Sequence, residues 1–296
     1  MTAAEIQEAI LSAGSVGVAY IGKFLNSAFA LSFVGALAGA AAGALAAQRV
    51  IERFRARDDL LKEIRNTNAA MMVSFTICNT ALGLKKQLVG PMQQRFLEAR
   101  KQFLAFREQR QAGQFQGNAP FHFEADLQGF MAPILPIETL KLLVFDRISA
   151  YGKPLSLVSL VENAGVGLAN AISQRDRLIV DFKGTALPPD AFALRYFGEK
   201  LASGHTHREY ADLVDVIHSY NNDLIFFSGQ LCTELAAHGQ TKGALFSKRF
   251  GKEAPTVSAP DFSGPKESGL FPPDSDYSSW LNWVVEKRQN GKGDAK

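Results

Sequence analysis

The sequence predicts an all-α protein with a single N-terminal transmembrane helix, a cytoplasmic helical bundle of long heptad-patterned helices, and a disordered tail. Three observations carry this prediction: an uncharged apolar stretch of membrane-spanning length, heptad spacing of apolar residues in long segments, and a proline-rich segment near the C-terminus. We expect a short N-terminal segment (1–26), the transmembrane helix (27–48) and the bundle domain (49–250). A flexible linker (251–276) and a terminal amphipathic helix (277–296) should follow.

The composition is that of a folded chain. Of 296 residues, 47% are hydrophobic and 21% are charged, and both fractions are ordinary for a folded protein. The net charge of +3 does not indicate a nucleic-acid partner. Cys78 and Cys232 show no CxxC or Cys/His spacing and fall within apolar helical patterns. We therefore expect two buried free thiols, as in proteins of a reducing compartment.

The transmembrane prediction depends on a window without charge. No charged residue occurs between Lys23 and Arg49, and residues 28–47 read AFALSFVGALAGAAAGALAA. A helix of this length spans the hydrocarbon core of a bilayer, which is about 30 Å thick. Two alternatives are a buried alanine-rich helix of a soluble protein and a signal peptide cleaved near residues 44–46. The long acidic leader and the basic residues that follow argue against the signal peptide.

The basic residues around this window predict its orientation. The preceding segment holds only Lys23, whereas six basic residues follow the window: Arg49, Arg53, Arg55, Arg57, Lys62 and Arg65. The positive-inside rule then keeps the C-terminal domain in the cytoplasm, as a single-pass membrane protein. The first four of these arginines can also contact anionic membrane lipid.

Gly35, Gly39 and Gly43 form a GxxxGxxxG pattern within the predicted span. Small residues at this spacing let two transmembrane helices approach closely, so the pattern predicts self-association into a homo-oligomer. An alanine- and glycine-rich helix also produces such spacing by chance. A pore would need a further amphipathic segment, for which the weakly apolar residues 9–22 are the candidate.

Apolar residues with heptad spacing predict the bundle. In the longest seam, one residue in seven is Phe54, Leu61, Asn68, Phe75 or Leu82, and Ile64, Met71 and Cys78 each follow the middle members by three residues. Asn68 is the polar residue that should set the register of this seam. This pattern continues the predicted span as one helix over 27–88, which Gly90-Pro91 should end. Further helices are expected at 92–111, 138–149, 154–182, 189–199 and 208–238, the last ending before Gly239.

Residues 121–127 (FHFEADL) depart from the helical pattern, because apolar and polar side chains alternate strictly. A lone strand leaves backbone groups unpaired. The segment therefore either packs on the bundle as an extended strap, which we favour, or pairs with another copy or a partner.

The tail combines two compositions. Residues 251–276 are rich in Pro, Ser and Gly, which predicts a flexible linker with little folded structure. The following segment contains both tryptophans and predicts a short helix with an apolar face formed by Trp280, Leu281, Trp283 and Val284. Such a helix can dock into a protein partner, fold back on its own domain, or lie at the membrane surface.

Catalytic motifs are absent from the sequence: it has no GxxxxGK[ST], no HExxH and no GxSxG, and we expect no cofactor. His205 and His207, with His218 and nearby acidic residues, are the one candidate metal site. The heptad frame places His218 and its acidic neighbours outward, which favours a solvated helix face.

The leading functional hypothesis is therefore a non-enzymatic, membrane-anchored scaffold that recruits or senses a partner at the cytoplasmic face. A membrane-disrupting or pore-forming effector that uses the glycine pattern is the alternative from another class. A metal-dependent hydrolase at the three histidines is the less favoured one.

Overall fold

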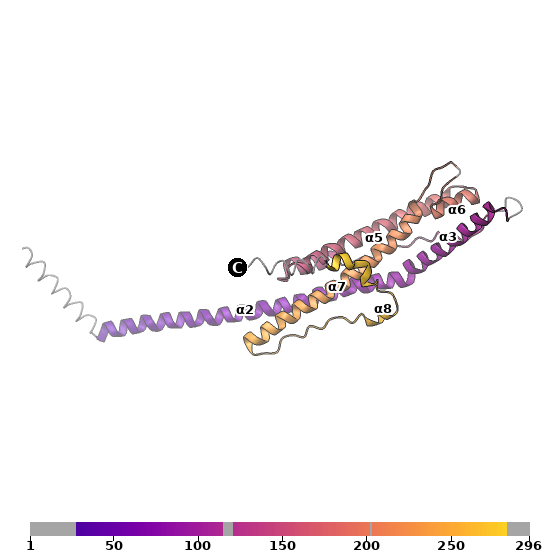
Figure 1. Ribbon diagram of the computed structural model, residues 1–296. Helices are drawn as coiled ribbons and strands as arrows, with labels where there is room; N and C mark the ends of the chain where they lie inside the picture. The colour runs from indigo at the N-terminus through magenta and orange to yellow at the C-terminus, as the bar shows by residue number, and fades with distance from the viewer. Residues whose placement is uncertain (1–27, 115–120, 202, 283–296) are drawn as a thin grey trace, which may run out of the picture. The chain divides into compact units, whose positions relative to one another are not determined.

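The computed structural model describes residues 28–114, 121–201 and 203–282, and every regular element within them is a helix (Figure 1). The all-helical prediction is confirmed. The chain divides into two compact units, Met1–Leu60 and Leu61–Lys296. The longest helix, α2 (Ala28–Leu84), contributes residues to both.

In the first unit, the described part of α2 has an exposed surface. Every residue from 35 to 55 is exposed, including the large apolar side chains Leu37, Leu45, Val50, Ile51 and Phe54. Residues 1–26 lie outside the described part of the chain. The transmembrane assignment of residues 27–48 stays a prediction.

Two long helices form the centre of the second unit. α5 (Lys153–Gly184) and α7 (Glu209–Phe250) lie side by side over much of their length (Figure 1). An ion pair between Lys153 and Glu234 at 2.6 Å and a ring contact between Phe182 and Tyr210 show that the two helices are antiparallel. Both were predicted, but α7 continues through Gly239 and ends only before Gly251, whose φ of 63° is left-handed.

α5 is also the one described helix that is long and apolar enough to cross a membrane. A buried core helix has the same composition, and 44% of its apolar window is buried inside the bundle.

The predicted helix break at Gly90-Pro91 is wrong. α2 passes through a π-turn (Lys85–Val89) directly into α3 (Gly90–Gln111). The Gly90 N–H bonds to the Lys85 carbonyl, and a Cβ at Gly90 would lie 2.9 Å from that oxygen. In a regular α-helix the Pro91 ring would clash with a carbonyl of the preceding turn. The wider π-turn removes this clash, so α2 continues into α3 without a break.

The predicted seam of α2 is half right. Ile64, Met71 and Cys78 are buried as expected. Of the other half, Leu82 is buried and Phe75 packs on the core as expected. The positions of this half that lie one residue earlier than predicted, Leu60, Thr67, Ser74 and Ala81, are nevertheless all buried. Phe54 is 59% exposed, and Asn68 donates from Nδ2 to the Thr256 carbonyl in the tail rather than facing a neighbouring helix. Small side chains occupy this half because α2 and α7 lie close together along it.

Shorter helices complete the bundle: α4 (Ile137–Lys141), the π-turn η2 (Leu142–Asp146) and α6 (Pro189–Phe197). Residues 121–136 form neither helix nor strand, and the side chains of Phe121, Phe123, Ala125 and Leu127 pack on the core. His122 and Glu124 are exposed. The alternating segment is therefore a strap on its own bundle.

The prediction of a disordered tail is wrong for residues 251–282. This segment includes α8 (Ser263–Glu267), the 3-10 turn η3 (Asp274–Tyr277) and helical residues 278–282. Its apolar side chains pack on glycines of α7: a Cβ at Gly239 would lie 2.8 Å from Val257, and one at Gly229 would lie 2.6 Å from Phe271. These glycines give the tail a surface to pack on, which its own composition does not reveal.

Candidate functional site

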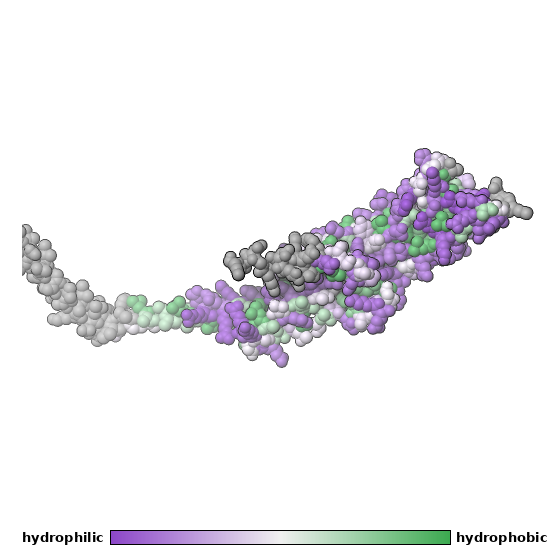
Figure 2. Space-filling view, in the orientation of Figure 1, coloured by the Kyte–Doolittle hydropathy of each residue, from purple (hydrophilic) through white to green (hydrophobic). Residues whose placement is uncertain are grey.

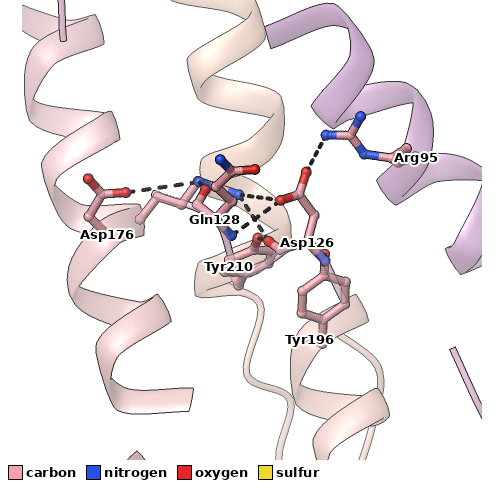
Figure 3. Close-up of polar contacts among 7 residues, drawn as sticks. Arg95, Asp126, Gln128, Asp176, Tyr196 and Tyr210 are labelled. Carbon is pink, nitrogen blue, oxygen red and sulfur yellow. Dashed lines mark hydrogen bonds and ion pairs between the residues drawn. The ribbon is translucent and has the colours of Figure 1, made fainter. Parts of the chain in front are cut away.

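A buried arginine on α5 holds the strap to the bundle. Arg175 is 1% exposed; its Nη1 donates to the Gln128 carbonyl at 3.0 Å and its Nη2 donates to the Asp126 carbonyl at 3.1 Å (Figure 3). Its guanidinium also lies over the rings of Phe130 and Tyr210, with centroid distances of 5.6 and 5.5 Å. A buried charge is tolerated only with such partners.

Asp126 receives contacts from three further helices. The Tyr210 hydroxyl of α7 donates to the Asp126 carbonyl at 2.8 Å. The Asp126 N–H in turn donates to the Tyr196 hydroxyl of α6 at 3.1 Å. Arg95 of α3 pairs with its carboxylate at 2.6 Å (Figure 3). Burial raises the pKa of Tyr196, and the neighbouring Tyr210 raises it further. Burial also raises the pKa of Tyr210, although the positive Arg175 opposes this, so both phenols stay neutral hydrogen-bonding groups.

We call residues 126–128 and these four helical side chains the strap clamp. It encloses a cavity of about 60 Å³ that Leu88, Met92, Arg95 and Arg175 help to line. Arg175 also has one buried atom, Nε, without a hydrogen-bond partner in the described part of the chain. Polar groups beside a cavity of this size suit a few bridging waters rather than a metabolite. The clamp is therefore a device for holding the strap in one position.

The strap exposes large apolar side chains directly after the clamp. Met131 is 91% exposed and Ile134 is 98% exposed. Met131 also lines a groove of about 380 Å³ between the strap and α5, whose other lining residues are Phe130, Ala132, Ala169, Ile172, Ser173, Asp176, Arg177 and Val180. Val180, on its α5 side, is 70% exposed. Clustered apolar side chains in solvent are typical of a surface that binds another molecule. We call this surface the strap groove.

A polar cluster fastens the loop before α5. Glu63 Oε1 accepts a hydrogen bond from the Ser149 N–H at 3.1 Å and also one from the Ser149 hydroxyl. His238 Nε2 lies 3.0 Å from the same oxygen, and Lys242 Nζ lies 3.2 Å from it. Burial acts to raise the pKa of Glu63, but the hydrogen bonds from Ser149, Lys242 and His238 together lower it. The cluster ties α2, α7 and this loop together through one charged carboxylate.

The predicted site residues fall in different places. At Gly35, Gly39 and Gly43, no described atom lies within 4 Å of the place that a Cβ would occupy, so their face of α2 is open. Arg49, Arg53 and Arg55 are exposed, and Arg57 is half-buried.

The structure brings the described part of the predicted docking helix onto the bundle itself. Trp280 packs against Phe227 with ring centroids 5.5 Å apart, and Lys153 Nζ lies 5.4 Å from its ring. Leu281 packs on the same core, whereas Trp283 and Val284 lie outside the described residues. For Trp280 and Leu281, the alternative of folding back on the bundle is the one observed.

The histidines do not form a metal centre within the described residues, where no three His, Cys, Asp or Glu side chains lie close enough to hold an ion. His205 is exposed, His207 lies 3.8 Å from Glu209, and His218 contacts Asn222. The metal-dependent hydrolase has no support here.

Sequence reasoning missed Arg175, although a signal for it existed. Val161, Leu168 and Phe182 share one face of α5 at heptad spacing, and Arg175 occupies the same heptad position between them. A charge within an otherwise apolar seam indicates a buried partner. Its partner lies on the strap, far away in the sequence, and so could not be assigned. No protein family, curated protein or solved structure matches this chain.

Proposed function

We propose that this protein is a membrane-anchored helical scaffold whose bundle binds an apolar segment of a protein partner in the strap groove, at the cytoplasmic face. The observation that carries the proposal is the full exposure of Met131 and Ile134 on a strap that Arg175 holds in place. A strap whose backbone is already held at residues 126 and 128 loses less backbone entropy when a partner covers the apolar side chains that follow.

The anchor is supported by the composition and the exposure of α2. Residues 28–48 carry no charge, the large side chains Leu37 and Leu45 are more than half exposed, and basic residues follow. Figure 2 shows this apolar stretch of α2 followed by a hydrophilic block. A lipid environment would cover such side chains, and the basic flank favours a cytoplasmic bundle. The open face with Gly35, Gly39 and Gly43 supports self-association of the anchor.

The groove is tested with full-length protein in its membrane. A photo-crosslinking residue in place of Met131 should capture one predominant protein, because the groove lies beside it. Adding Ile134→Ser should reduce that capture about tenfold, since it removes an apolar contact of roughly 1.5 kcal/mol.

The matched control is Tyr151→Ser, which removes a large side chain that is also highly exposed but lies outside the strap. It should leave the captured protein unchanged. Equal capture by the Ile134→Ser and Tyr151→Ser proteins, or capture of no single protein, would contradict the proposed docking function.

A further inference from the structure

The end of α7 forms a basic turn with apolar side chains beside it. Lys248, Arg249 and Lys252 are all exposed, and none of them forms an ion pair with another described residue. Leu245 is 45% exposed, and the Arg249 guanidinium lies 5.6 Å from the centre of the Phe250 ring. The chain reverses at Gly251, whose left-handed φ of 63° suits glycine.

This turn is held rigidly to the bundle. The Phe250 ring packs against Phe246 with centroids 5.2 Å apart, and Phe246 is 2% exposed. On the tail side, Ala254 packs opposite Gly243. The exposed basic side chains therefore project from a fixed platform, which we call the α7 turn (residues 245–252).

The position of the α7 turn within the bundle follows from the contacts of α2. The second unit begins at Leu61, and Glu63 of α2 lies 3.2 Å from Lys242 of α7. Asn221, much earlier in α7, bonds to Ala81 near the other end of α2. The two helices are thus antiparallel, and the C-terminal end of α7 lies where α2 enters the bundle. From Lys242, α7 continues to Phe250, which adds roughly 12 Å of helix in that direction.

We propose that the α7 turn binds the headgroups of anionic phospholipids and thereby holds the bundle against the membrane. This inference rests on the proposed function, because the end of the bundle at which α2 enters is the membrane end only if residues 28–48 span the bilayer. Lysine and arginine attract the anionic leaflet, while Leu245 and Phe250 suit the interface. Glu253 offsets one charge, and the two net positive charges favour an anionic over a neutral surface by roughly 30-fold.

The test uses the full chain reconstituted in phosphatidylcholine vesicles, with and without phosphatidylglycerol. A fluorophore on Ser247→Cys reports the exposed side of the α7 turn, because Cys78 and Cys232 are buried and escape labelling. A nitroxide quencher on the lipid headgroup should quench this fluorophore strongly only in the anionic vesicles. A fluorophore on Ser203→Cys, which lies beyond the opposite end of α7, should stay unquenched in both the neutral and the anionic vesicles.

Charge variants identify the residues responsible. Lys248→Gln/Arg249→Gln/Lys252→Gln should abolish the extra quenching in anionic vesicles. The matched control, Lys101→Gln/Lys183→Gln/Lys200→Gln, removes the same charge from exposed positions elsewhere. This variant should keep the extra quenching in anionic vesicles.

The outcomes separate the two proposals. Equal quenching in neutral and anionic vesicles, with the protein still integrated, would overturn the lipid contact and leave the anchor intact. Relief of quenching by inorganic phosphate at constant ionic strength would mean that the turn binds soluble phosphate, which also overturns the lipid contact. A protein that does not integrate into any vesicle would remove the anchor and the contact together.

Discussion

The two halves of α2 differ in which side chains they bury. In its described first part, Leu37, Leu45 and Phe54 are each more than half exposed. In its second part, Thr67 and Ser74 are completely buried. One continuous helix therefore exposes leucine and phenylalanine and buries threonine and serine.

The second half buries polar groups because each finds a hydrogen-bond acceptor. The Ser74 hydroxyl donates to the Ser228 carbonyl of α7 at 2.9 Å, and Thr67 donates to the Glu63 carbonyl of its own helix at 2.8 Å. The thiols of Cys78 and Cys232 lie 3.6 Å from carbonyl oxygens of the opposite helix. Burial raises the pKa of Cys78 to about 12 and that of Cys232 to about 11, so both stay neutral.

The comparison teaches that fit against a neighbouring helix contributes to burial beside side-chain hydropathy, because the second half buries Thr67 and Ser74 together with Ile64 and Ile77. Small side chains let α2 approach α7 closely, and close approach brings their polar atoms to backbone acceptors. Among the described residues no such neighbour covers the apolar first half, which is the part of the helix that we propose as the anchor.

The largest expected effect is on the first half. Leu37→Asp/Leu45→Asp should move the protein from the alkali-resistant membrane fraction to the soluble fraction. An aspartate costs about 3 kcal/mol at the centre of a membrane span, so the two substitutions oppose insertion by roughly 5 kcal/mol. Phe54→Asp changes a similarly exposed residue beyond Arg49 and is the matched control, which should remain membrane-bound. Unchanged fractionation of the double variant would break the assignment of this half to lipid.

An intermediate effect is expected in the second half. Ser74→Leu makes the seam more apolar, yet it should lower the free energy of unfolding by about 3 kcal/mol. The larger side chain overpacks the contact with α7 and the bond to Ser228 is lost. Denaturant titration of the detergent-solubilised protein measures this change. Thr76→Leu, on the exposed side of the same helix, should change the free energy by less than about 0.5 kcal/mol. If both variants behave alike, the close seam is not what stabilises this half.

The smallest expected effect extends the comparison to the tail. Gly239→Ala should destabilise by about 2 kcal/mol, because its Cβ would lie 2.8 Å from Val257 and 3.1 Å from Thr67. Gly83→Ala has open space and should instead stabilise α2 by up to about 1 kcal/mol.

Trypsin provides a second measurement of the tail. Cleavage at Lys266 should become faster in the Gly239→Ala protein and stay unchanged in the Gly83→Ala protein. Equal protection in both would mean that the tail does not depend on the glycine contact.

Much of the helical content could be predicted, because period and composition are local properties. The apolar spacing of α5 and α7 and the strict alternation around Phe123 each follow from side-chain directions along a helix or an extended chain. Helix ends were less predictable. Gly90 and Gly239 resemble stops in the sequence, but Gly90 begins α3 directly after a π-turn and Gly239 packs under Val257.

The site could be predicted only in fragments. The charge of Arg175 within an apolar seam is visible in the sequence, but the two carbonyls that it binds belong to residues 126 and 128. Backbone acceptors carry no sequence signature, so the strap clamp could not be assigned. The same holds for the tail, whose apolar residues are too few to predict folding until the glycines of α7 provide surfaces that fit them.

The sequence by itself determined that the chain is helical, that an uncharged apolar window precedes a basic cluster, and that apolar and polar residues alternate in one short segment. These are properties of neighbouring residues, set by backbone geometry and by the local density of charge. Only the tertiary structure decided that Arg175 fastens the strap, that Met131 and Ile134 stay exposed, and that the tail covers α7. Each of these depends on groups distant in sequence meeting at contact distance, where close packing and hydrogen-bond partners outweigh the tendency of any single residue.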